Sequence, residues 1–348
     1  MQLLSFTQID LNDPFFDSLK EDYREFEAWY EKKAKSNAMA YVSHDEHGYV
    51  QAFLYLKVES SAIEDVAPRL EEKKWLKVGT FKVNPHGTRL GERFVKKLLD
   101  HAVIHEVDSV YVTVFPTHNG LIRLLERYGF TKQAEKTTEN GVEDVLVKEM
   151  NVLTGRSLHD YPLIKLEGRR KFVLSIYPAF HTQLFPDSKL FNEKYDLIQD
   201  VSHTNSIHKI YISFMSGVQA LNSGDIVVIY RTTDTDGNAH YRSVVTSICV
   251  VEEVKRRRDF ASINDYIAYC QSYSVFDESD LRKWFNRNGD LFIIKMTYNI
   301  ALKKRLIRKV LIEDLGINSG YWGFFEIDNN QFKSIINQGE VNESIIID

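Results

Sequence analysis

The segment from Trp75 to Phe130 constrains the fold of this chain more than any other part of its sequence. Apolar side chains alternate with polar ones along 75–83, which predicts a strand, and Asn84-Pro85 ends it. The loop 86–91 carries two glycines and an arginine, and apolar residues at helical spacing follow it over 92–103. The sequence therefore predicts a strand, a basic glycine-containing loop and a helix in direct succession.

Another strand and another helix complete this segment. Residues 109–115 alternate as a strand does, and 116–119 separate them from a helix predicted over 120–128. Gly129-Phe130 ends that helix. This order of elements favours an α+β unit with a binding loop at one end of a sheet.

The start of the first helix has the chemistry of a phosphate site. The first helical turn carries backbone N–H groups without helical partners, and the helix dipole adds positive partial charge there. Gly87 and Gly91 allow the backbone to approach a phosphate group, while Arg89 and Arg93 add charge-assisted hydrogen bonds. We predict that this loop binds a pyrophosphate; a solvated turn with a helix cap is the alternative.

The whole pattern resembles the GNAT superfamily of acetyltransferases. Its signature is a strand, an (Arg/Gln)-x-x-Gly-x-(Gly/Ala) loop, a helix, a further strand and a helix that ends in Gly-Phe. The resemblance covers roughly residues 1–150 and includes a helical run over 15–35 and a hairpin formed by 39–43 and 49–58. It implies an N-terminal mixed sheet flanked by helices.

The resemblance also implies acetyl-CoA as the cofactor and direct transfer of the acetyl group to an amine. Backbone groups around Phe81 and Val83 are then expected to pair with the pantetheine arm, and residues 87–92 to surround the pyrophosphate. Such an enzyme positions the reactants, removes an ammonium proton and protonates the leaving thiolate. The cofactor-binding residues expected on these grounds are Phe81, Val83, Gly87, Thr88, Arg89, Leu90, Gly91, Glu92, Arg93 and Asn119.

The sequence departs from the family at positions that usually carry catalysis. Leu125 stands where a general-acid tyrosine is common, and Arg89 replaces the first glycine of the loop motif. His118 and Tyr128 are therefore the candidate catalytic residues, because an imidazole exchanges protons near neutral pH and a phenol can donate one. The alternatives are that His118 caps the following helix and that the Tyr128 ring packs in the core.

The composition is typical of a soluble protein with two domains of ordinary size. The 348 residues are 43% hydrophobic and 27% charged, and no apolar run reaches 18 residues. Because the N-terminus has no basic and apolar leader, we expect a cytoplasmic protein without a membrane segment. His101 and His105 lie four residues apart, but no third ligand is evident, so no metal site is predicted.

The composition of the chain changes after residue 150. We predict domains at 1–152 and 172–348, joined by a linker over 153–171. In the second domain, strands are predicted at 172–178, 209–214, 225–231, 241–254 and 291–298, and helices at 179–185, 263–272, 278–286, 303–315 and 331–336.

This succession resembles the ASCH and PUA-like group of small barrels, and it implies a β-barrel with helical insertions. Tyr177 occupies the position of that group's usual lysine and no Glu-x-Arg follows, so binding is expected rather than hydrolysis. Many members of the group bind RNA. The nucleic-acid-binding residues predicted here are Arg170, Lys171, Lys255, Arg256, Arg257 and Arg258. The alternative is that these clusters are solvated helix ends, since the whole chain carries a net charge of −5.

Together the two resemblances imply an acetyl-CoA-dependent N-acetyltransferase of the α+β class, fused to a PUA-like domain that selects a macromolecular acceptor. An amine linked to RNA is the preferred acceptor, and a protein amine is the next. The alternative is a non-catalytic RNA-binding or regulatory protein whose first domain keeps the fold without turnover.

Overall fold

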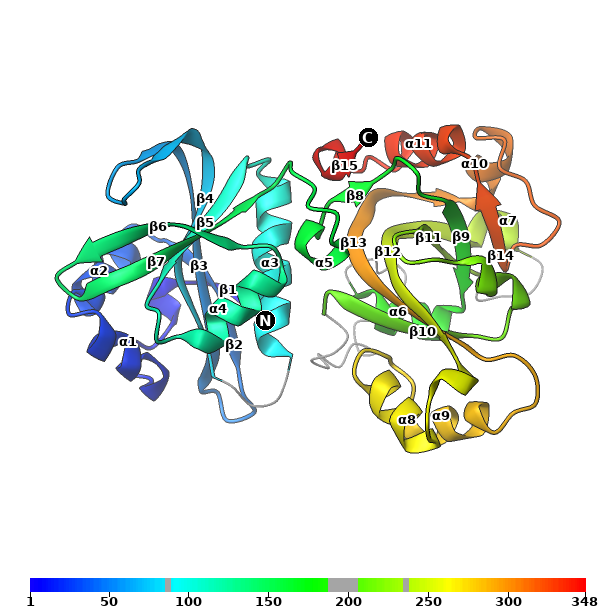
Figure 1. The fold of residues 1–348 in the computed structure, drawn as a ribbon, viewed down its shortest axis with the longest axis horizontal. Helices are drawn as coiled ribbons and strands as arrows, with labels where there is room; N and C mark the ends of the chain where they lie inside the picture. The colour runs from blue at the N-terminus through cyan, green and yellow to red at the C-terminus, as the bar shows by residue number, and fades with distance from the viewer. Residues whose placement is uncertain (85–88, 187–205, 234–237) are drawn as a thin grey trace. The chain divides into compact units, whose positions relative to one another are not determined.

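The computed structural model describes residues 1–84, 89–186, 206–233 and 238–348. These residues form two compact units, Met1–Thr154 and Gly155–Asp348 (Figure 1). Gly87 and Thr88, which we predicted to contact the pyrophosphate, lie outside the described residues. Within the described part of the chain, none of the helices has both the length and the apolar character of a membrane span.

A seven-stranded mixed sheet forms the centre of the first unit, in the order β1-β2-β3-β4-β5-β7-β6. β4 and β5 run parallel, and the other described neighbours are antiparallel. The strands are β1 (Gln2–Ser5), β2 (Met39–His44), β3 (Val50–Ile63), β4 (Leu70–Val83), β5 (Ser109–Val114), β6 (Thr131–Thr138) and β7 (Gly141–Glu149). The predicted strands at 75–83 and 109–115 are thus the central pair of this sheet.

Helices cover both faces of this sheet, with α2 and α3 on opposite sides (Figure 1). The helices are α1 (Asp17–Asp22), α2 (Phe26–Lys35), α3 (Leu90–Ile104) and α4 (Asn119–Arg127). The apolar stripe of α3 is buried at Phe94, Leu98 and Leu99, as helical spacing predicts. The helical run predicted over 15–35 is divided, because Tyr23 adopts an extended backbone conformation after α1.

The second unit is built on a six-stranded sheet in the order β10-β13-β12-β11-β9-β14. Its strands are β9 (Lys171–Ile176), β10 (His208–Ser213), β11 (Ile226–Arg231), β12 (Val244–Arg256), β13 (Phe292–Ile307) and β14 (Phe324–Ile327). Its helices are α5 (Ser157–Asp160), α6 (Pro178–Leu184), α7 (Ala239–Arg242), α8 (Ile263–Gln271), α9 (Glu278–Phe285), α10 (Arg308–Glu313) and α11 (Asn329–Gln338). A short parallel pair, β8 (Ile164–Lys165) and β15 (Ile346–Ile347), lies apart from the main sheet.

The mixed α+β class predicted from the sequence is confirmed, with two differences in the second unit. The described strands form an open sheet, since no pairing joins its edge strands β10 and β14 into a closed barrel. The helix predicted over 303–315 is shortened to α10, because β13 continues to Ile307 and pairs there with β12 at Val244↔Ile307.

The range 153–171, which we predicted as a linker, contains α5 and β8 within the second compact unit. Tyr161 is fully buried and donates a hydrogen bond to the backbone oxygen of Tyr298 at 3.0 Å. Asn299 donates to the oxygen of Pro162 at 3.1 Å. Buried side chains and hydrogen bonds of this kind hold the segment against β13.

Candidate active site

The two central strands of the first sheet pair along only part of their length. β4 and β5 are paired from Trp75↔Ser109 to Val78↔Val112 and part beyond that point. β4 then stays paired with β3 as far as Ala52↔Val83, and β5 stays paired with β7 as far as Val114↔Asp144. Along 79–83, the backbone N–H and C=O groups on the β5 side of β4 therefore make no hydrogen bonds to any described strand. Such an edge can pair with an extended ligand.

A β-bulge at Gly79 marks the point where the strands part. Tyr55 pairs with Thr80 and Leu56 with Val78, which leaves Gly79 as the extra residue on β4. A Cβ atom on Gly79 would lie 2.6 Å from Tyr55 Cδ1, a distance at which the Tyr55 ring would have to move. Because a bulge bends its strand and increases its twist, this glycine directs β4 away from β5.

The parted strands open onto a cavity of about 1000 Å³ within the first unit. Residues 77–84 of β4 and its end form one wall, and residues 112–114 of β5 form another. The segment of α1 and α2 covers a third side, and the first turns of α3 and α4 complete the lining. A cavity of this size can enclose most of a cofactor.

The starts of α3 and α4 meet at one end of this cavity. Arg89 is the N-cap residue of α3, and its Nη1 atom lies 4.0 Å from Glu92 Oε2. A Cβ atom on Gly91 would lie 2.9 Å from Leu124 Cδ2, so glycine permits the close approach of α3 and α4. The first turns of two helices with an arginine beside them form an environment that favours an anion.

The predicted cofactor residues are partly brought together by this arrangement. Those that line the cavity are Phe81, Val83, Arg89, Gly91, Glu92 and Asn119. Leu90 and Arg93 are buried in α3 and do not line it, because their side chains point to other sides of the helix. Glu92 is only 5% exposed, and its carboxylate would repel a phosphate, so we expect only its backbone to contact the cofactor.

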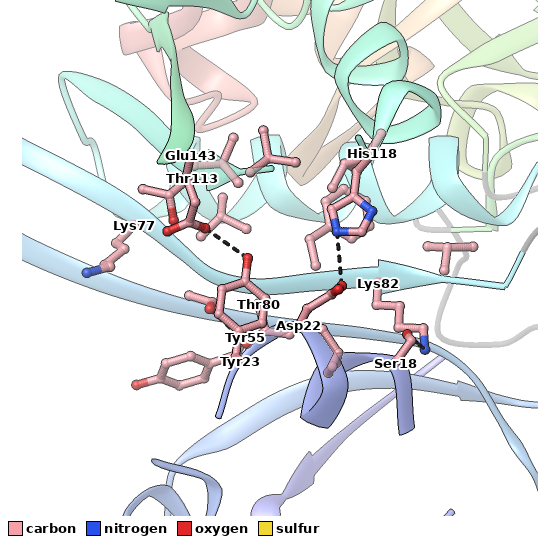
Figure 2. A pocket seen from close by; sticks show the side chains of 18 of the residues that line it. Ser18, Asp22, Tyr23, Tyr55, Lys77, Thr80, Lys82, Thr113, His118 and Glu143 are labelled. Carbon is pink, nitrogen blue, oxygen red and sulfur yellow. Dashed lines mark hydrogen bonds and ion pairs between the residues drawn. The ribbon is translucent and has the colours of Figure 1, made fainter. Parts of the chain in front are cut away.

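His118 forms a dyad with an acidic residue that we did not predict (Figure 2). It occupies the N-cap position of α4, but its side chain makes no capping hydrogen bond. Instead, its Nε2 atom lies 3.2 Å from Asp22 Oδ2, across the cavity at the end of α1. Both side chains are partly exposed, at 43% and 36%, so a reactant in the cavity can reach them.

The neighbouring residue Tyr23 forms a second polar pair across the cavity. Its hydroxyl donates to Glu143 Oε1 of β7 at 2.8 Å, and its ring stacks on Phe115 with centroids 5.2 Å apart. Burial, and then the Glu143 carboxylate, raise the pKa of Tyr23 well above its ordinary value. The phenol therefore stays protonated and holds the buried Glu143 carboxylate in place.

Asp22, Tyr23 and Glu143 were missed because their neighbours in sequence give no motif. Tyr23 and Glu143 are 120 positions apart and meet only through the fold. Nothing in the sequence signalled them, since 15–35 was predicted as one helical run and its break at Tyr23 is seen only in the structure.

The structure places Tyr128, our other candidate catalytic residue, away from the cavity. Its side chain is fully buried at the end of α4, and it is not among the lining residues. A group that exchanges protons with a substrate must come within hydrogen-bond distance of it. The packing role that the sequence also allowed is the one consistent with this position.

The predicted nucleic-acid residues are mostly bonded within the second unit. Lys171 is 3% exposed, and its Nζ atom donates to the backbone oxygens of Leu166 at 2.9 Å and Arg169 at 2.6 Å. Arg170 forms an ion pair with Asp225 at 3.0 Å. These two side chains bind parts of their own unit, as buried or half-buried cations generally must.

The second predicted cluster has a similar environment. Lys255 lies 4.4 Å from the ring centroid of Tyr269, and Arg256 lies over the ring of Phe292 at 5.5 Å. Arg257 donates to the backbone oxygen of Gly289 at 3.2 Å, whereas Arg258 is exposed. The structure therefore does not bring the six predicted residues together as one exposed basic surface.

No protein-family model and no curated protein matches the sequence. Among solved structures, ASCH from Zymomonas mobilis is 10% identical with a TM-score of 0.33, over 48% of this chain and 94% of that one. A GNAT-family acetyltransferase from Streptococcus agalactiae is 16% identical with a TM-score of 0.29, over 38% of this chain and 78% of that one. Naa20 from Chaetomium thermophilum, solved in complex with a bisubstrate analogue, is 17% identical with a TM-score of 0.30, over 43% of this chain and 86% of that one.

The ASCH and acetyltransferase likenesses fall on different halves of the chain. One half of this chain is similar in fold to GNAT acetyltransferases, and the other half is similar in fold to ASCH proteins.

Proposed function

We propose that this protein is an N-acetyltransferase that uses acetyl-CoA. The observation that carries the proposal is the parting of β4 and β5 at Gly79 and Val112, directly onto the cavity. An extended arm with amide groups fits such an edge, because its N–H and C=O groups can replace those of a missing strand. Pantetheine is an arm of this chemistry.

In this proposal, the cofactor runs from the helix starts to the parted strands. The pyrophosphate lies at the first turns of α3 and α4, near Arg89, Gly91 and Asn119. The pantetheine arm pairs with the backbone between Phe81 and Val83, where none of the described strands pairs with β4 on the β5 side. The thioester then lies inside the cavity, beside residues that can move a proton.

We assign that proton transfer to His118, with Asp22 as its positioning residue. The neutral imidazole takes a proton from the acceptor ammonium, and the free amine forms a bond to the thioester carbonyl carbon. The carbon–sulfur bond then breaks, the imidazolium returns the proton to the departing thiolate, and the new amide nitrogen releases its remaining extra proton to water. Asp22, 3.2 Å away, stabilises the imidazolium between these two steps.

The acceptor in this proposal is an amine carried by a macromolecule, with RNA ahead of protein. What supports it is the presence of a second folded unit on the same chain, which is available for recognition. Mass spectrometry of cellular RNA and protein, with and without the enzyme, tests this part. Acetylation of free small amines alone would contradict it.

Calorimetry with acetyl-CoA tests the cofactor site directly. We expect sub-millimolar binding, weakened by Arg89→Glu by about tenfold to a hundredfold, because a charge-assisted bond of about 1.5–3 kcal/mol becomes a repulsion. The matched control is Arg123→Glu, which makes the same charge change on an exposed position of α4 outside the cavity. Its affinity should equal that of the wild type.

Two results would contradict the proposal. Undetectable acetyl-CoA binding by a folded sample excludes the cofactor site. Tight binding without release of CoA thiol in the presence of any RNA or protein amine favours the non-catalytic alternative.

A further inference from the structure

We propose that Lys77 selects acceptors that carry an anionic group, a carboxylate or a phosphate, on the same molecule as the amine. This inference rests on the proposed acetyl transfer, and it names the acceptor chemistry of the same cavity. Lys77 lies on β4 two residues before the bulge at Gly79.

Lys77 lies where the active-site cavity meets a smaller groove. It lines the main cavity and also an adjoining groove of about 470 Å³ along the β3–β4 hairpin. Lys57 and Glu59 line both the cavity and the groove, and the groove continues along residues 60–65, at and just beyond the end of β3. A molecule that enters the cavity from this groove must pass the Lys77 side chain.

The acidic groups around Lys77 already have cationic partners. Glu59 accepts hydrogen bonds from Lys57 at 2.7 Å and from the Tyr111 hydroxyl at 2.9 Å. Asp65 pairs with Lys136 at 2.6 Å. The third described carboxylate of the groove, Glu64, lies 3.8 Å from Arg69, so each of these acidic groups has a cationic partner other than Lys77.

Lys77 itself makes no ion pair or hydrogen bond through its ammonium group with any of the described residues. Its described direct contact is with the face of the Tyr111 ring, whose centroid lies 5.7 Å away. Burial, together with the nearby Lys136 and Lys57 ammonium groups, lowers the pKa of Lys77 in spite of Glu59 and Asp65. Because Lys77 has no direct ion pair among the described residues, part of its desolvation cost is not offset, and an incoming anion would offset it.

The position of Lys77 relative to the proton-transfer dyad sets the kind of acceptor. Figure 2 shows Lys77 at one side of the view and His118 with Asp22 farther across it, with Tyr23 and Glu143 between them. An acceptor whose anion contacts Lys77 must therefore extend along the cavity to present its amine near His118. A spacer between the amine and the anion is expected.

Calorimetry on the protein saturated with CoA tests this without turnover. The probes are 6-aminohexanoate, 6-aminohexyl phosphate and the neutral-tailed hexylamine, so that carboxylate and phosphate are measured separately. We expect at least one anionic probe to bind tenfold or more tightly than hexylamine. Lys77→Met should reduce that ratio to less than threefold, and Lys77→Arg should restore most of it because it keeps the charge.

Lys74→Met is the matched control, since Lys74 is an exposed lysine of the same strand outside both the cavity and the groove. It should leave the ratio unchanged. Equal binding of all three probes by the wild type, or an unchanged preference in Lys77→Met, would overturn the inference.

The proposed function can fail separately from this inference. If CoA does not bind, the same probes are titrated into the free protein. The ratio of affinities for the anionic probes and hexylamine then still tests the role of Lys77. If anionic probes bind more tightly than hexylamine but 6-aminohexanoate is never acetylated, the anion subsite is supported and the proposed acetyl transfer is contradicted.

Discussion

The two units use the same kinds of polar side chain in different ways. In the first unit, His118, Arg89 and Lys77 line a cavity that parted strands open. In the second unit, His181 and Lys171 are buried and bonded to their own unit. A histidine or a basic cluster in a sequence therefore indicates a site only when the fold leaves its polar atoms facing a cavity.

The largest expected effect of a substitution is a loss of activity, without a loss of stability, at His118 in the first unit. His118→Ala should lower kcat for acetyl transfer about a hundredfold or more, because general acid–base groups contribute roughly 10²–10⁴. The affinity for acetyl-CoA and the melting temperature should stay close to wild type, since the side chain is 43% exposed. Thiol release with an accepted amine measures the rate, and Asp22→Asn should give a smaller loss. An unchanged rate would remove the dyad from the mechanism.

The buried histidine of the second unit should affect stability instead. His181 is fully buried with its Nε2 atom 2.8 Å from Thr246 Oγ1, and burial first, then Arg231 and Arg305, lower its pKa from 6.5 to about 3. Between pH 6.5 and pH 3, His181 is protonated in the unfolded chain but stays neutral in the folded chain. Stability is therefore lost as pH falls from 6.5 towards 3, by about 2 kcal/mol at pH 5.

Denaturant unfolding of the wild type and His181→Gln at pH 7 and pH 5 checks this. The variant should lose less stability than the wild type between the two pH values. His101, whose pKa is lowered to about 4 by burial and by His105 and Lys97, contributes equally to both proteins and cancels. An equal loss in both would show that His181 does not titrate as described.

Lys171 should likewise behave as a structural residue. Lys171→Met leaves the backbone oxygens of Leu166 and Arg169 without their donor, and we expect a loss of about 1 kcal/mol of unfolding free energy. Lys165→Met, at an exposed position of β8, is the control and should change stability little. RNA affinity should be the same for both variants. A selective loss of RNA binding in Lys171→Met would return this residue to the nucleic-acid surface.

The smallest effect is expected at Arg258, the exposed member of the predicted clusters. Arg258→Ala should change the unfolding free energy by less than about 0.5 kcal/mol. RNA affinity and its salt dependence should also be unchanged. A fall in affinity together with a decrease of about one in the salt slope would show a phosphate contact there and weaken the contrast between the units.

The sequence predicted the elements whose patterns are strong. β4 and β5 have buried apolar residues at alternating positions, and α3 has a clear apolar stripe. β6 was not predicted, because its polar sequence buries only Ala134 among its eight residues. β13 was predicted to end at 298, with a helix over 303–315 after it, yet pairing with β12 extends the strand to Ile307.

The candidate site was predictable only where its residues are close in sequence. Arg89, Gly91, His118 and Asn119 follow from the order of strands and helices. Asp22, Glu143 and Lys77 reach the cavity from separate elements, and no local pattern distinguishes them from surface charges. The bulge at Gly79 is set by its contact with Tyr55 on the neighbouring strand, which alternation within β4 does not reveal.

The central claim is that the free edge of β4 holds the pantetheine arm of acetyl-CoA. Hydrogen exchange measured by mass spectrometry, with and without saturating acetyl-CoA, tests it most directly. The account predicts slower exchange in peptides covering 79–83 and 113–121, with no change at 70–76, where β4 is already paired, or in the second unit. Unchanged exchange at 79–83, or protection confined to the second unit, would contradict it.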